Sequence, residues 1–158
     1  FDTILGRGKA SAVGLPSRLV YAGFSLGVTP AQALAQTRPG AAGALLVSAA
    51  LPPGELGRSW PRGVPFQIHM MEEDPWVQEG DLDAARTLVG SAPQGELFLY
   101  PGRAHLLAER GVPDYDPRAA AELTRLSPLL SPGDRYSPVI RPLRSIRSRP
   151  LDGITEAG

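Results

Sequence analysis

The segment that most constrains the fold reads LVYAGFSLG and runs from Leu19 to Gly27. Its first half is an apolar run, which ends where two glycines flank Ser25. A segment with apolar residues at helical spacing follows at once, from Leu26 to Thr37. This order predicts a buried strand, a tight turn with a serine at its tip, and a helix.

The pattern G-x-S-x-G is typical of a nucleophile elbow, in which a strained turn exposes the serine hydroxyl above a sheet. We expect Gly23 and Gly27 to let the strand and the helix approach closely, because neither residue has a Cβ atom. The motif alone is equally compatible with a glycine-rich turn and an idle Ser25, because the chain contains 18 glycines. The rest of the sequence must decide between these two interpretations.

Four apolar segments alternate with segments of helical periodicity. The predicted strands are Arg18–Ala22, Ala42–Ala50, Val64–Met71 and Gly95–Tyr100. The predicted helices are Leu26–Thr37, Asp81–Val89 and a last helix from Asp116, its N-cap, to Leu130. The strands are apolar almost without interruption, as in parallel sheets that are covered on both faces. The sequence therefore predicts a three-layer α/β/α fold around a parallel sheet.

Three segments are less regular. Phe1–Val13 contains glycines that weaken a helix, and it is ambiguous between a loop and the end of a helix that packs before the first strand. Leu51–Gly63 is rich in proline and glycine and is predicted to be a loop, whose Trp60 packs locally or lines a pocket. Residues 131–158 lack periodicity and carry prolines and arginines, so we expect a disordered tail or a docking arm after a domain of residues 1–130.

The composition excludes several kinds of site. The chain has no cysteine, which rules out disulfides, cysteine zinc sites and a cysteine nucleophile. With only His69 and His105 present, a histidine metal cluster is not expected. The formal net charge is zero, so nothing favours nucleic acid or an anionic membrane as a partner. No apolar run reaches the length of a membrane span, and no signal segment is visible, so we expect a cytoplasmic protein. The first residue is Phe1, which indicates a fragment or a processed product.

Three residues with complementary chemistry follow three of the predicted strands. Ser25 follows the first, Asp74 the third and His105 the fourth. Reactive groups gather at the carboxyl ends of the strands in an open parallel sheet. A serine needs a base to remove its proton, histidine is the base suited to neutral pH, and a carboxylate fixes the histidine tautomer. The order serine, acid, histidine is that of the α/β-hydrolase arrangement.

Each assignment has an alternative. Asp74 could be a turn residue before Pro75, and Glu72 or Glu73 could then supply the acid. His105 could be a loop histidine without a role. His69 lies inside an apolar strand and is expected to be a core histidine with its hydrogen bonds satisfied.

Four blocks in this order resemble the dienelactone hydrolase family of α/β-hydrolases. They are YAGFSLG at Tyr21–Gly27, HMMEEDP at His69–Pro75, YPGRAH at Tyr100–His105 and DYDPRAAAEL at Asp114–Leu123. The resemblance covers roughly residues 17–130. It implies an α/β-hydrolase fold that lacks its N-terminal strands, because family members have further strands before the elbow strand.

The resemblance implies a serine hydrolase that acts on a small-molecule ester or lactone through an acyl-enzyme. Ser25 would be the nucleophile, His105 the base, Asp74 the residue that orients His105, and the Leu26 N–H an oxyanion donor. No cofactor and no metal are implied. The founding members use cysteine as nucleophile, whereas this chain, like many relatives, has serine.

The sequence departs from the family at two points. Dienelactone hydrolases proper have a substrate-binding arginine four residues after the histidine, where this chain has Glu109 followed by Arg110. The resemblance therefore does not extend to dienelactone as the substrate. The loop that gives the second oxyanion donor precedes the elbow strand in the family, which leaves Leu26 as the predicted donor. Phe24 and Leu26 flank the nucleophile and could either line an acyl pocket or be packing residues. An alternative hypothesis for the whole chain is a non-catalytic remnant or scaffold that keeps the hydrolase pattern.

Overall fold

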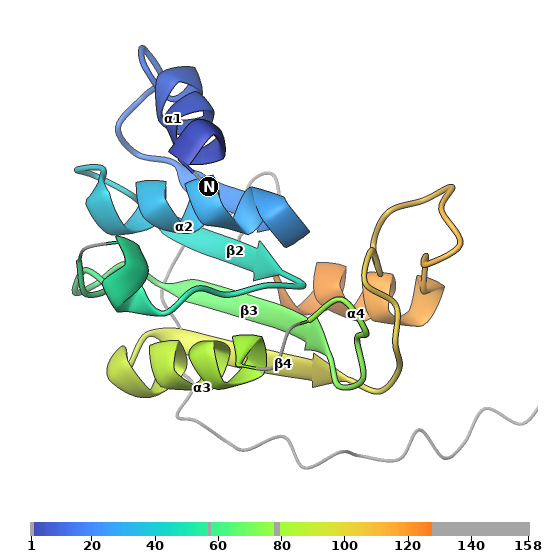
Figure 1. Ribbon diagram of the computed structural model, residues 1–158. Coiled ribbons are helices and arrows are strands. Elements are labelled where there is room, and N and C mark those ends of the chain that lie inside the picture. Colours follow the sequence, from blue (N-terminus) through green and yellow to red (C-terminus); the bar gives the residue numbers. More distant parts are fainter. Residues whose placement is uncertain (1, 57, 78–79, 128–158) are drawn as a thin grey trace, which may run out of the picture.

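The computed structural model describes residues 2–56, 58–77 and 80–127 (Figure 1). Four parallel strands form one sheet, and their order across the sheet is the same as their order along the chain. The strands are β1 (Val20–Phe24), β2 (Gly43–Val47), β3 (Phe66–Met71) and β4 (Gly95–Tyr100). The helices are α1 (Asp2–Ser11), α2 (Val28–Thr37), α3 (Asp81–Ser91) and α4 (Pro117–Leu126), with short 3₁₀ turns at Ser25–Gly27 and Pro53–Leu56. This is the expected α/β architecture with a parallel sheet.

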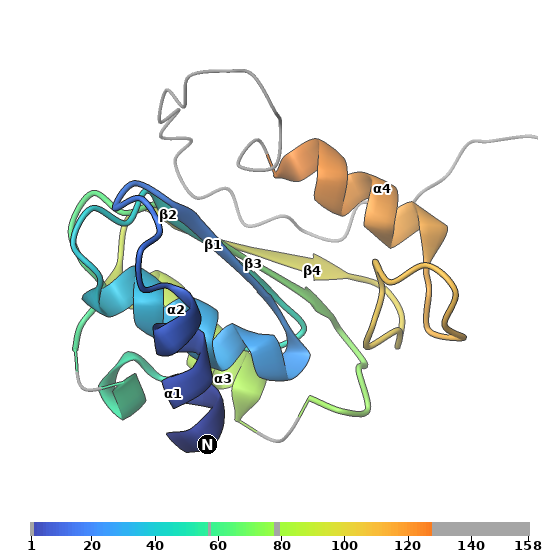
Figure 2. The same ribbon diagram turned by 90° about the horizontal axis from the view of Figure 1, so that it is seen from above.

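The sheet lies between two layers of helices, as Figure 2 shows from above. Helices α1, α2 and α3 lie on one side of the sheet and α4 on the other. Every residue of the two central strands, β2 and β3, is buried, which explains why their sequences are apolar without alternation. One core cluster joins α2 and α3 to the sheet, and the other joins α4 to β2, β3 and β4.

Among the described residues, strand β1 is an edge of the sheet and is covered on one face only. The α4 side of the core includes residues of β2, β3 and β4 but none of β1. On β1 itself, Tyr21 and Gly23 are buried, whereas Ala22 and Phe24 are exposed. In the part of the chain that the structure describes, β1 therefore has an open edge and one open face.

Most predicted elements agree with the structure, with shifted ends. Strand β4 has the predicted bounds, and Asp116 is the N-cap of α4, where its carboxylate accepts hydrogen bonds from the N–H groups of Arg118 and Ala119. Strand β1 begins and ends two residues later than predicted, because Gly23 and Phe24 still pair with β2. The predicted end of the last helix at Leu130 and the predicted tail lie outside the described residues.

Helix α1 forms despite its glycines. A Cβ atom on Gly8 would lie 2.2 Å from the Cβ of Pro30, so Gly8 is where α1 contacts the start of α2. Glycine in this helix has a packing role that outweighs its weak helix propensity. Trp60 is buried in the core, where its ring centroid lies 4.1 Å from that of Phe66 and its N–H donates to the carbonyl of Val64.

Among the described residues, no helix has both the length and the apolar character needed to cross a membrane.

Candidate active site

The serine turn has the geometry of a strained elbow. Ser25 has φ of 49°, in the left-handed region that non-glycine residues seldom adopt, and it follows directly after β1. A Cβ atom on Gly23 would lie 2.3 Å from the carbonyl oxygen of Gly27 and 2.8 Å from the Cα of Val28. Gly23 is thus the glycine that lets strand and helix approach. Gly27 has open space around its own Cβ position, so the expected close approach at both glycines is wrong for Gly27.

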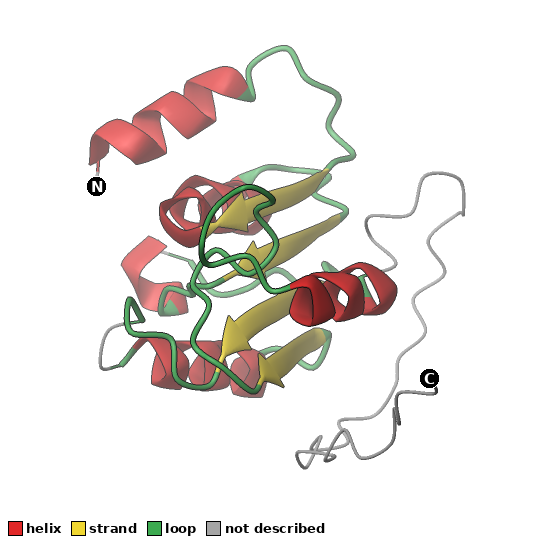
Figure 3. Ribbon diagram, turned by 90° about the vertical axis from the view of Figure 1, so that its right-hand side faces the viewer, coloured by secondary structure: helices red, strands yellow, loops and turns green. Residues whose placement is uncertain are grey.

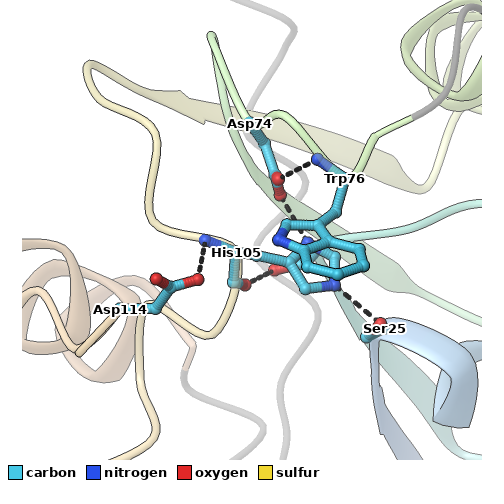
Figure 4. Close-up of polar contacts among 6 residues, drawn as sticks. Ser25, Asp74, Trp76, His105 and Asp114 are labelled. Atoms are coloured by element: carbon cyan, nitrogen blue, oxygen red, sulfur yellow. Dashed lines mark hydrogen bonds and ion pairs between the residues drawn. The ribbon is translucent and has the colours of Figure 1, made fainter. Parts of the chain in front are cut away.

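The three polar residues predicted from the sequence meet at the carboxyl end of the sheet (Figure 4). His105 Nε2 lies 2.7 Å from Ser25 Oγ, and His105 Nδ1 lies 2.7 Å from Asp74 Oδ2. A carboxylate can only accept, so Nδ1–H donates to Asp74, and the Ser25 hydroxyl donates to the unprotonated Nε2. The imidazole is therefore in the tautomer that can take the proton of Ser25.

The carboxylate of Asp74 is buried and has both oxygens paired. Its side chain is fully shielded from solvent, and that of His105 is 12% exposed. The second oxygen, Oδ1, accepts a hydrogen bond of 2.9 Å from the backbone N–H of Trp76. A buried charge needs such partners, and here they also fix the direction in which the carboxylate points.

The loops that carry Asp74 and His105 continue the pairing of β3 and β4. The N–H of Glu72 donates to the carbonyl of Tyr100, and the N–H of Glu73 donates to the carbonyl of Gly102. Both glutamates are exposed, and the Glu73 carboxylate lies 3.8 Å from the Arg103 guanidinium. Of the three candidate acids, Asp74 is the one that the structure places against His105.

His69 is a core residue, away from the Ser25 hydroxyl. It is fully buried, its Nδ1 lies 2.7 Å from the Tyr100 hydroxyl, and its ring stacks on that of Phe98 with centroids 4.7 Å apart. Burial lowers the pKa of His69 to about 3, so its imidazole is neutral at ordinary pH. Burial also raises the pKa of Tyr100.

Several side chains near the site were not identified from the sequence. The Ser48 hydroxyl donates to the carbonyl of His105, and the Asp114 carboxylate accepts from the N–H of His105. The indole of Trp76 lies tilted at 39° to the imidazole of His105, with centroids 6.0 Å apart. Asp114 begins one of the blocks that resemble the family, but serine and aspartate in loops have many roles, and no local pattern indicates that Ser48 or Asp114 contacts His105.

Exposed apolar residues flank Ser25 in the chain and lie beside His105. Leu26 follows Ser25 in the 3₁₀ turn, and the side chains of Phe24, Leu26 and Trp76 are 43%, 64% and 71% exposed. Glu109 stands where dienelactone hydrolases proper have an arginine, and Arg110 follows it. Both residues are exposed. Within residues 2–56, 58–77 and 80–127, no group of three histidine, cysteine or acidic side chains is placed to hold a metal ion.

Comparison with known proteins places the chain in a family. The model of the dienelactone hydrolase family matches residues 8–127. A search of curated proteins found no match. Two crystal structures share the fold: a provisionally assigned dienelactone hydrolase from Klebsiella pneumoniae subsp. pneumoniae MGH 78578 and a provisionally assigned YdeN-like hydrolase from Pectobacterium atrosepticum SCRI1043.

The first superposes with a TM-score of 0.56 at 17% sequence identity. The match covers 79% of this chain and 55% of the Klebsiella chain. The second has a TM-score of 0.50 at 24% sequence identity. The match covers 78% of this chain and 64% of the Pectobacterium chain. This chain therefore spans less than two thirds of the length of either structure. The family model matches residues 8–127. The parallel sheet, which has Ser25, Asp74 and His105 together at its carboxyl end, agrees with this match. The chain belongs to the dienelactone hydrolase family.

Proposed function

We propose that this protein is a serine hydrolase that cleaves an ester or lactone bond of a small molecule through a catalytic triad of Ser25, His105 and Asp74. The observation that carries the proposal is the continuous path of two 2.7 Å contacts from Ser25 Oγ through both imidazole nitrogens to Asp74 Oδ2. Family membership supports a hydrolase, and the geometry supports serine as the nucleophile.

The proposed reaction has two halves. The Ser25 oxygen attacks the carbonyl carbon while its proton moves to Nε2 of His105, and Asp74 stabilises the imidazolium that forms. The tetrahedral intermediate then collapses, and His105 returns the proton to the leaving alcohol, which leaves an acyl group on Ser25. Water repeats the sequence with His105 as base and releases the acid. The Leu26 N–H is our candidate donor to the oxyanion, because it follows the nucleophile in the elbow.

The surface around Ser25 favours an uncharged, apolar substrate. The exposed side chains next to the nucleophile are Phe24 and Leu26, and the indole of Trp76 lies beside the imidazole. Contact with these side chains would remove apolar area from water on both partners. The position that bears an arginine in dienelactone hydrolases proper is Glu109, which gives no reason to expect a carboxylate on the substrate.

The test is hydrolysis of a series of p-nitrophenyl esters by the protein and by Ser25→Ala. Ser59→Ala is a matched control, because Ser59 is exposed and lies in the loop before β3, away from the carboxyl ends of the strands. We expect Ser25→Ala to lose activity and Ser59→Ala to keep it. A fluorophosphonate should also label Ser25, as shown by mass spectrometry of the tryptic peptide. Equal hydrolysis by the protein and by Ser25→Ala would refute the assignment of the nucleophile.

The alternative of a non-catalytic remnant predicts a different outcome. A remnant has no need to keep Ser25, His105 and Asp74 within hydrogen-bonding distance of one another. In this structure, the imidazole of His105 lies at that distance from both other side chains. Absence of both ester hydrolysis and fluorophosphonate labelling in a folded protein would favour the remnant.

A further inference from the structure

The backbone of His105 is held at both of its polar groups by side chains from two other segments. Its N–H donates to Asp114 Oδ2 at 3.2 Å, and its carbonyl accepts from Ser48 Oγ at 2.5 Å. Figure 4 shows the contact with Asp114 beside the contacts of the imidazole. Neither Ser48 nor Asp114 forms a hydrogen bond with Ser25 or Asp74 in the described structure. Both instead hold His105, the residue whose imidazole must reach Ser25 and Asp74.

Ser48 is rigidly placed for this contact. It is 2% exposed, it follows β2 directly, and its N–H donates to the carbonyl of His69 at 2.8 Å, so its backbone is fixed to β3. Its φ of 63° lies in the left-handed region, where a serine is strained and a glycine is not. A strained residue persists where the surrounding structure holds it, and such positions are concentrated at functional sites.

The position of Ser48 in the sheet explains its use. Strand β2 lies between β1, which leads to Ser25, and β3, which leads to Asp74. The segment of residues 101–116, which we name the histidine loop, comes from β4 and must pass the ends of β3 and β2 to bring its imidazole to Ser25 (Figure 3). Ser48 meets the loop on this path, at His105 itself.

Asp114 closes the histidine loop on itself. It is half-buried and reaches back nine residues to His105, and nearby the N–H of Asp116 donates to the carbonyl of Leu107. The backbone of residue 116, whose N–H remains in any side-chain variant, thus fixes the end of the loop, and the Asp114 side chain fixes its start. Side chains that contact the backbone of a loop residue restrict its position in a way that the side-chain contacts of that residue alone cannot.

We propose that Ser48 and Asp114 are positioning residues, which hold the backbone of His105 so that its imidazole reaches Ser25 and Asp74 together. The inference rests on the proposed function for its catalytic consequence. Reaction rates depend steeply on placement, and a displacement of about 1 Å can cost about 100-fold. Loss of either contact should therefore lower kcat at least about ten-fold. The KM should change less than about two-fold, because neither residue lies among the exposed apolar side chains around Ser25.

The variants separate the hydroxyl of Ser48 from its backbone strain. Ser48→Ala and Ser48→Gly both lack the hydroxyl, but Ser48→Gly accepts the left-handed conformation without strain. A role for the hydroxyl predicts the same fall of kcat in both variants. A role for the backbone conformation alone predicts full activity in Ser48→Gly, which would overturn the proposal for Ser48.

Asp114 offers a matched pair with Asp116. Asp114→Ala removes the acceptor of the His105 N–H, whereas Asp116→Ala removes the cap of α4 and touches no atom of His105. We expect Asp114→Ala to lower kcat and Asp116→Ala to lower the melting temperature at unchanged kcat. Asp114→Asn keeps a carbonyl oxygen that can accept, and it should restore most of the activity. Equal kcat of Asp114→Ala and the unmodified protein would overturn the proposal for Asp114.

A spectroscopic measurement keeps this inference separate from the hydrolase assignment. The chain has two histidines, so the ring signals of His105 can be identified with a His69→Gln variant. The Nδ1 proton of His105, held by Asp74, should exchange faster with water in Ser48→Gly and Asp114→Ala than in the unmodified protein and Asp116→Ala. Unchanged exchange would overturn positioning even in a protein that hydrolyses no ester. Failure of the hydrolase proposal would instead appear as equal ester hydrolysis by the protein and by Ser25→Ala.

Discussion

Gly23 and Gly27 pass each other so closely that a Cβ atom on Gly23 would lie 2.3 Å from the carbonyl oxygen of Gly27. The relationship is not symmetrical, because a Cβ atom on Gly27 would have no described residue within 4 Å apart from its chain neighbours. The two glycines of one motif therefore have different physical roles, and they give a direct test of the elbow.

Gly23→Ala should destabilise the protein and Gly27→Ala should not. The new methyl group at residue 23 meets backbone atoms of residues 27 and 28, which cannot rotate away as a side chain could. We expect Gly23→Ala to lower the free energy of unfolding by more than about 2 kcal/mol. Gly27 has φ of −67°, which alanine adopts freely. Gly27→Ala should therefore change the free energy of unfolding by less than about 1 kcal/mol. Urea unfolding of the two variants measures the difference, and similar values for both would contradict the crossing geometry.

Asp74→Asn should nearly abolish catalysis while leaving the fold intact. The amide can no longer accept the Nδ1–H of His105 as an anion, and it favours the wrong imidazole tautomer. We expect kcat for ester hydrolysis to fall about 10³- to 10⁴-fold, on the scale of serine hydrolases with the same arrangement. Glu73→Gln is the control, since Glu73 is exposed and pairs with Arg103. Comparable losses in both variants would contradict the choice of Asp74 as the acid.

His69 should make the protein sensitive to mild acid. Its pKa is lowered by burial from 6.5 to about 3, so below pH 6.5 the unfolded chain binds a proton that the folded protein does not. The stabilisation is complete above pH 6.5 and is lost as the pH falls from there towards 3. Between pH 7 and pH 5 this one group should remove about 2 kcal/mol from the free energy of unfolding.

The measurement for His69 is urea unfolding at both pH values, for the protein and for His69→Gln. The glutamine variant is expected to be less stable at pH 7, because the contact with Tyr100 changes, but its stability should vary less with pH. An equal pH dependence in the two proteins would show that another group titrates in this range.

Trp76→Ala should alter substrate preference more than stability. The indole is 71% exposed and lies against the imidazole of His105, whereas the hydrogen bond to Asp74 comes from the backbone of residue 76 and survives the substitution. We expect kcat/KM to fall about ten-fold for long or aromatic esters and less for acetates. Leu15→Ala removes an exposed apolar side chain from the loop before β1 and serves as control. The same fall for all esters would indicate that Trp76 acts on His105 and not on the substrate.

The sequence predicts those parts of the fold that local chemistry determines. Strand β4 has its predicted bounds because it begins at a glycine, Gly95, and Pro101 follows it. Helix α4 begins where Asp116 can cap it. The ambiguity of residues 1–13 had a physical cause, since the value of Gly8 in α1 lies in its contact with Pro30, which no local pattern reveals.

The candidate site also contains residues that the sequence predicts and residues that it does not. Ser25, Asp74 and His105 could be proposed from the sequence because each follows a strand that could be recognised. Ser48 and Asp114 could not, because their contacts with His105 depend on how the histidine loop crosses the sheet. The prediction that both elbow glycines allow a close approach was wrong for Gly27 because the motif does not say which of its two glycines faces the helix.

The strand order has a consequence for when the site can exist. The contact between Ser25 and His105 joins residues 80 positions apart, which follow the first and the last strand of the sheet. Such a long-range contact requires the closure of a large loop and cannot precede the pairing of the strands between. Nucleophilic reactivity of Ser25 should therefore be among the last properties gained in folding and the first lost when either sheet edge detaches. A reagent that reacts with this serine then reports on the integrity of all four strands at once.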